Sequence, residues 1–137
     1  MTRRFAVVAI LAFGAACSSN PSPTGPSVPL DQRFTLAPSE TALVPAAGFS
    51  VQFVSVTGDS RCPADAMCIQ GGDAVVAVRV RDSGDATATY DLHTGDSARA
   101  AAKHREFRVE LVELQPYPFS SRPTTHTEYR ATLRVTR

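Results

Sequence analysis

The sequence predicts an all-β fold, a small antiparallel β-sandwich or barrel of about seven strands with one short helical turn. Two observations carry this prediction. Apolar and polar residues alternate in several segments after residue 30, as on strands with one buried and one solvent-facing side. Turn-forming Gly, Asp and Ser residues separate these segments. Residues 30–137 are long enough for one hydrophobic core, so we expect a single domain there.

The predicted strands follow one another with turns between most of them. Two short strands come first and longer ones follow, rich in the Val and Thr that a half-buried pleated surface favours. In order they are Arg33–Leu36, Thr41–Val44, Phe49–Phe53, Ala74–Arg81, Thr87–His93, Glu106–Gln115 and Tyr129–Thr136.

The stretch from residue 97 to residue 115 fits two patterns. Its apolar residues recur from residue 100 at steps of four and three, as on an amphipathic helix, but residues 107–111 alternate as on a strand. We expect a helical turn at Ser97–Lys103, capped by Asp96 or Ser97, and then a strand at Glu106–Gln115. The strand is preferred because without it the sheet has too few partners.

The N-terminus has the layout of a secretory signal. Arg3 and Arg4 precede an apolar run, Phe5–Phe13, that is too short to remain in a bilayer as a spanning helix. Small residues follow directly before Cys17. We therefore assign residues 1–16 to a signal peptide and exclude them from the fold.

Cys17 makes this signal more specific. A cysteine after small residues at the end of an apolar run resembles the lipobox of bacterial lipoproteins. The resemblance implies cleavage before Cys17 and fatty acids, palmitate among them, on its thiol and new amino group. Gly14 stands where that class usually has Leu, and ordinary signal peptidase would also accept these residues, which leaves a secreted or periplasmic protein as the alternative.

Residues 17–29 read as a linker. They are rich in Pro and Ser, cannot bury apolar surface, and would hold the domain about 35 to 40 Å from a membrane when extended. Removing residues 1–16 takes two of the 14 basic side chains, which leaves 12 against 13 acidic ones, a net charge of −1. This balance argues against nucleic acid as a partner.

Cys62 and Cys68 are the other two cysteines. Export would place them in an oxidising compartment, and five intervening residues with Pro63 can turn back to close a disulfide. A redox pair would favour Cys-x-x-Cys spacing, and a zinc site would need two further ligands nearby. We therefore predict a structural disulfide.

The segment around these cysteines resembles a group of uncharacterised bacterial secreted and lipid-anchored proteins. The shared pattern is Asp59–Pro63 (DSRCP), Cys68, Gly72 and a valine-rich strand, and residues 114–118 and 129–133 resemble the closing segment of that group. The resemblance implies fold and compartment but no activity. Gln70 stands where the group usually has Trp.

Candidate residues for catalysis or metal binding are few. The histidines His93, His104 and His126 are far apart and match no metal-binding motif. His126 and Glu128 could share one side of a strand and contribute to a metal site. Asp59, Asp65 and Asp73 flank the cysteine loop and could bind calcium weakly, although exposed loop aspartates are the simpler interpretation. We predict no catalytic residue, no metal and no cofactor.

Tyr117 and Phe119 lie in a proline-rich loop, PYPFSSRP, and are candidate partner-binding residues because a stiff loop loses little entropy on binding. They could equally plug the open end of the sandwich. The leading hypothesis is a non-enzymatic, lipid-anchored envelope protein that binds an unidentified ligand, with another envelope protein as one candidate partner. Ser18 after the cysteine would permit release to the outer membrane in a Gram-negative host. The alternatives are a secreted protease inhibitor that presents the disulfide loop, and a hydrolase whose site assembles only in space.

Overall fold

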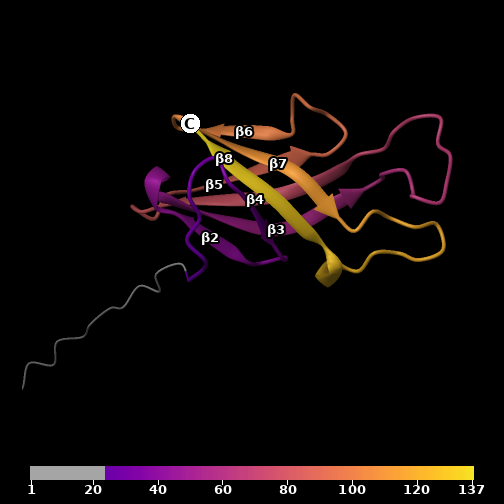
Figure 1. The fold of residues 1–137 in the computed structure, drawn as a ribbon, viewed down its shortest axis with the longest axis horizontal. Helices are drawn as coiled ribbons and strands as arrows, with labels where there is room; N and C mark the ends of the chain where they lie inside the picture. The colour runs from indigo at the N-terminus through magenta and orange to yellow at the C-terminus, as the bar shows by residue number, and fades with distance from the viewer. Residues whose placement is uncertain (1–23) are drawn as a thin grey trace, which may run out of the picture.

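The structure is a computed structural model that describes residues 24–137 and contains two four-stranded antiparallel sheets (Figure 1). The predictions for the signal peptide, Cys17 and the first part of the linker lie outside the described residues. One sheet has the strand order β1-β8-β7-β6 and the other β2-β3-β4-β5. The strands are β1 (Arg33–Leu36), β2 (Thr41–Val44), β3 (Phe49–Asp59), β4 (Ala74–Asp82), β5 (Thr87–His93), β6 (Ala101–His104), β7 (Phe107–Gln115) and β8 (Arg130–Thr136). The predicted small β-sandwich is confirmed.

The main correction concerns the helical turn predicted at Ser97–Lys103. This prediction is wrong, because residues 97–100 form turns and β6 follows as an eighth strand that pairs with β7. A strand satisfies the hydrogen-bonding groups along the free side of β7, which a helix here would leave unpaired. It also buries His104 between the sheets. The described chain has helical turns elsewhere, at η1 (Pro45–Ala47) and η2 (His126–Glu128).

The core lies between the inward faces of the two sheets. Alternate residues of β3, β4, β7 and β8 point into it, as the period of two predicts. Each fully buried apolar side chain contributes about 1.5–3 kcal/mol to folding. The largest fully buried side chains are Phe53, Leu36, Leu92, Leu133, Val44, Val51, Val76, Val78, Val80, Val109 and Val135.

The end of the predicted linker packs against the free edge of β2. The Val28 amide donates to the Leu43 carbonyl and the Leu43 amide donates to the Pro26 carbonyl, both at 2.8 Å. At Gly25 a Cβ atom would overlap the carbonyl oxygen of Thr41, so only glycine permits this approach. The packed domain therefore begins before Leu30, and this segment covers an edge that would otherwise be open.

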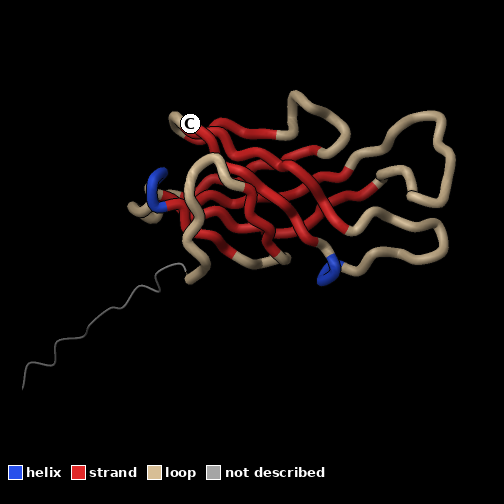
Figure 2. Tube along the Cα trace, in the orientation of Figure 1, coloured by secondary structure: helices blue, strands red, loops and turns tan. Residues whose placement is uncertain are grey.

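Loops extend from one end of the sandwich. Figure 2 shows the β3–β4 loop and the β7–β8 loop projecting beyond the strands at the right, far from the residue 24 end of the described chain. Within residues 24–137, no helix is long and apolar enough to cross a membrane.

Candidate binding site at the loop end

The β3–β4 loop is closed by a disulfide between Cys62 and Cys68. Their Cα atoms are 6.0 Å apart, a normal separation for this bond, and the predicted pairing is confirmed. Inside the ring, the Ala66 amide donates to the Pro63 carbonyl at 3.1 Å. The ring is thus a short, closed turn at the end of the domain.

Arg61 precedes the ring and is buried, with only 7% of its side chain exposed. Its Nε donates to Asp59 Oδ1 at 2.9 Å and its Nη2 donates to Asp59 Oδ2 at 2.7 Å. Its Nη1 and Nη2 also donate to the carbonyl oxygens of Leu114, at 2.7 Å, and Pro116, at 2.8 Å. One guanidinium therefore ties the β3–β4 loop to the end of β7 and the start of the next loop.

Asp59 completes this buried cluster. The Tyr129 hydroxyl donates to Asp59 Oδ2 at 3.0 Å. Burial raises the pKa of the Asp59 carboxyl, but the hydrogen bonds and charge of Arg61, with the Tyr129 bond, outweigh it and hold that pKa below its ordinary value. Burial and the neighbouring Asp59 carboxylate raise the pKa of Tyr129. The carboxylate is therefore the form of Asp59 that this cluster requires.

Ser60 closes the base of the loop. Its amide and its hydroxyl both donate to the Asp73 carbonyl, at 2.7 and 3.0 Å. At Gly72, a Cβ atom would overlap the Ser60 carbonyl oxygen, so the two ends of the loop can come this close only if residue 72 is glycine. Asp59, Ser60, Arg61, Cys62 and Pro63 thus all have structural roles in holding the loop.

The disulfide loop and the β7–β8 loop are joined to each other. The Ala64 amide donates to the Pro118 carbonyl at 2.8 Å. The Ser120 amide and hydroxyl donate to the Asp65 carboxylate at 2.8 and 2.6 Å. The Ser120 hydroxyl is the main reason why the pKa of Asp65 lies below its ordinary value. The loops therefore form one unit and not two independent excursions.

Four large apolar side chains are exposed on these two loops, and we call them the apolar tip. Met67 and Ile69 in the disulfide loop are fully exposed, at 102% and 104%. Tyr117 and Phe119 in the β7–β8 loop are 53% and 55% exposed. These are the large exposed hydrophobic residues of the described chain, and all of them are at one end.

The predicted partner-binding residues Tyr117 and Phe119 therefore lie at the same end of the molecule as two exposed residues that sequence reasoning missed. The two aromatic side chains are not buried in the open end of the sandwich. The Tyr117 ring lies against the Arg61 guanidinium, 5.3 Å from its centre, which fixes the ring's position. Met67 had one signal in the sequence, because a closed disulfide ring of seven residues has no interior that could bury its side chain. Ile69 directly follows this ring.

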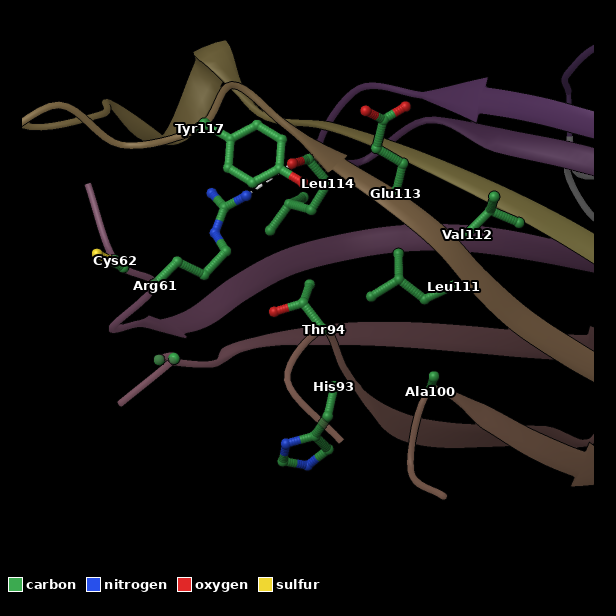
Figure 3. A pocket seen from close by; sticks show the side chains of 12 residues that line it. Arg61, Cys62, His93, Thr94, Ala100, Leu111, Val112, Glu113, Leu114 and Tyr117 are labelled. Atoms are coloured by element: carbon green, nitrogen blue, oxygen red, sulfur yellow. Dashed lines mark hydrogen bonds between the residues drawn. The ribbon is translucent and has the colours of Figure 1, made fainter. Parts of the chain in front are cut away.

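A cleft of about 310 Å³ lies beside the apolar tip, and Arg61 and Tyr117 line one side of it (Figure 3). Its titratable side chains do not converge. In Figure 3 the His93 ring and the Glu113 carboxylate point in opposite directions, and Arg61 lies between them. His93 is engaged by its Nδ1 with Asp73 Oδ2 at 2.5 Å. This arrangement does not bring a nucleophile to a general base.

The structure separates the other candidate residues. Asp59, Asp65 and Asp73 have different partners and do not share a site. His126 and Glu128 lie in η2 and not on the predicted strand, and Glu128 instead accepts hydrogen bonds from the Thr125 amide and from Arg122. Among residues 24–137 there is no group of three or more His, Cys, Asp or Glu side chains that could hold a metal ion.

His104 has a different environment, which its position in the sequence did not reveal. It is buried between the sheets, where its Nδ1 contacts the Tyr90 hydroxyl at 2.8 Å and its Nε2 contacts Asp82 at 3.2 Å. Phe49 packs edge-on against its ring. With both nitrogens engaged, His104 is part of the core.

Comparison with protein-family models, with curated proteins and with solved structures finds no match for this chain. The apolar tip and the N-terminal sequence are therefore the features from which a function can be inferred.

Proposed function

We propose that this chain is a lipid-anchored envelope protein that acts as a non-catalytic binding module and contacts another envelope protein through the apolar tip. The observation that carries the proposal is the grouping of Met67, Ile69, Tyr117 and Phe119 on two cross-linked loops. Exposed apolar patches on soluble domains mark interaction sites, and aromatic and Met side chains are enriched at protein interfaces.

The rigidity of the tip supports the same proposal. A disulfide closes one loop, Arg61 holds both loops to the sandwich, and Asp65 joins the loops through Ser120. Loops that are already ordered lose less conformational entropy on binding, so more of the contact energy appears as affinity. An exposed loop without a binding role would not need this many bonds to hold it in one conformation.

The anchor part of the proposal is supported by the sequence around Cys17. The tether would reach the domain at Gly25, where the chain packs on β2. In Figure 1 this end of the described chain is far from the two loops. A membrane-anchored molecule could therefore extend its apolar tip away from the tether.

Photo-crosslinking in the native envelope tests the tip. A photoreactive residue at position 67 or 119 is expected to give one discrete crosslinked product. The matched control is position 89, where Thr89 is exposed on the outer face of β5. The proposal fails if all three positions give the same products or none. The anchor is tested separately by mass spectrometry, which should find fatty acids on Cys17.

A secreted protease inhibitor remains a second candidate because of Met67. Its side chain is fully exposed within a closed disulfide ring, a geometry that suits a loop offered to a protease. A panel of host and bacterial proteases assayed with micromolar protein distinguishes the candidates. Inhibition that disappears in Met67→Gly would favour this one, and uniform lack of inhibition would remove it.

A further inference from the structure

The outer face of the β1-β8-β7-β6 sheet carries a basic patch. Arg33 on β1 lies directly opposite Arg134 on β8, and Lys103 on β6 lies directly opposite Arg108 on β7. We call these four side chains the basic quartet. Like charges directly opposite one another on an antiparallel pair destabilise a sheet, and this face has two such pairs.

Little negative charge compensates the quartet. Glu110 accepts hydrogen bonds from Arg134 Nε and Nη2, at 3.0 and 2.6 Å. Within the described residues, Arg33, Lys103 and Arg108 make no ion pair. Four positive charges against Glu110 and the exposed Asp31, two residues before Arg33, leave a local charge of +2, on a domain whose predicted mature chain has a net charge of −1. The charge of this face is therefore segregated from that of the rest of the molecule.

The quartet lies at the end of the sheet away from the apolar tip. Its residues on these strands lie at the start of β7 and in the last part of β8. The β7–β8 loop, which carries part of the apolar tip, instead joins the end of β7 to the start of β8. The incoming chain reaches the same end, because the Asp31 amide donates to the Val135 carbonyl at 2.8 Å, next to Arg134 and close to Arg33.

The docked N-terminal segment shortens the tether. If Cys17 is the anchor, only residues 18–24 lie between it and the glycine that packs on β2, and even a fully extended chain of that length spans at most about 25 Å. This distance is comparable to the size of a small domain, so the sandwich is kept close to the bilayer surface.

We infer that the basic quartet binds the phosphate headgroups of an anionic phospholipid bilayer and holds the sandwich against the membrane that anchors it. This inference rests on the proposed anchor. Charge complementarity and the shortness of the tether select the bilayer as the occupant. Basic side chains near an anionic membrane surface add to the binding that a lipid anchor provides.

The test compares the full chain on neutral phosphatidylcholine vesicles and on vesicles with added phosphatidylglycerol. Lys103→Gln with Arg108→Gln removes two quartet charges that have no ion partner. The control is the double variant Arg79→Gln and Arg81→Gln, which removes two positive charges from the outer face of β4 in the other sheet, one of them, Arg81, paired with Asp85 at the surface. Comparing the two vesicle types removes the contribution of the apolar N-terminal run, and comparing the variants with wild type removes that of Arg3 and Arg4, which all of them share.

Wild type is expected to prefer the anionic vesicles. The quartet variant should lose about thirtyfold of that preference and the control variant less than about threefold. Equal losses would mean that only net charge matters and would overturn the inference, as would no anionic preference in wild type. Equally tight, quartet-dependent binding to soluble polyphosphate would also overturn it, in favour of a polymeric ligand.

These outcomes are separate from those of the proposed function. An unmodified Cys17 removes the anchor without changing the vesicle comparison. Loss of the vesicle preference leaves the anchor and the tip crosslinks intact. Both double variants should remain folded in thermal unfolding, because all four side chains lie on outer sheet faces. The quartet variant should unfold at or slightly above the wild-type midpoint, since it removes one like-charge pair. The control should lose less than about 0.5 kcal/mol, because Arg81 gives up only a surface ion pair with Asp85.

Discussion

The buried Arg61–Asp59 pair allows the most demanding stability prediction. Asp59→Asn preserves the side-chain shape but removes the charge that faces a guanidinium of which only 7% is exposed. The amide oxygen can still accept one of the two Arg61 bonds, whereas its NH₂ group faces other donors, Arg61 Nη2 and the Tyr129 hydroxyl. Breaking a buried ion pair from one side costs about 3–5 kcal/mol, and the retained bond places the loss for this variant at about 3 kcal/mol.

Urea denaturation measures this loss as a lower midpoint with an unchanged slope. Asp85→Asn is the control, because Asp85 forms a surface ion pair with Arg81 in which the two side chains are 64% and 39% exposed. We expect the control to lose less than about 0.5 kcal/mol. A loss below about 1 kcal/mol for Asp59→Asn, or one equal to that of the control, would refute the role given to this pair.

Three further predictions concern the same loops. Acidification should narrow the stability difference between wild type and Asp59→Asn. A carboxyl with a lowered pKa contributes its full stabilisation above the ordinary value of about 4, and this contribution is lost as the pH falls through the folded-state pKa. Urea titrations at several pH values measure the difference. Gly72→Ala should lower the free energy of unfolding by more than about 2 kcal/mol, because the added Cβ atom overlaps the Ser60 carbonyl. Gly84→Ala, whose Cβ atom meets no atom within 4 Å, should lose less than half as much, as measured by thermal unfolding. Replacing both Cys62 and Cys68 by Ser should cost about 2 kcal/mol, and reduction of wild type should reproduce that loss.

The strands were predictable where one face is buried. Val78 and Val80 are fully buried and the arginines beside them face outward, so the alternation in the sequence reports the two sides of β4 directly. The ends of Arg33–Leu36 and Thr41–Val44 coincide with the observed strands for the same reason. By contrast, β6 has only four residues, two of them Ala, and such a segment carries neither alternation nor a strong propensity.

The site was predictable in its local parts only. Cys62, Cys68, Tyr117 and Phe119 are recognisable from residue type and neighbours. The burial of Arg61 is not, because it depends on carbonyl groups more than 50 residues later in the chain. A lone arginine in a polar loop gives no sign of such partners.

The docked segment before Leu30 was also hidden. Its Pro, Ser and Gly residues have the composition of a flexible linker, and composition does not show that β2 has a free edge. The pairing of Val28 with Leu43 follows from that edge.

The proposed function depends on contact between the apolar tip and a partner. The most direct test places a photoreactive residue at position 117. The crosslink yield is then compared between the chain with wild-type residues at 67 and 69 and the double variant Met67→Ser and Ile69→Ser. Both side chains are fully exposed, so the unfolding midpoint should not change. We expect the discrete product that forms with the wild-type residues at 67 and 69 to disappear from the native envelope. The same product at the same yield in the double variant would contradict the proposed function.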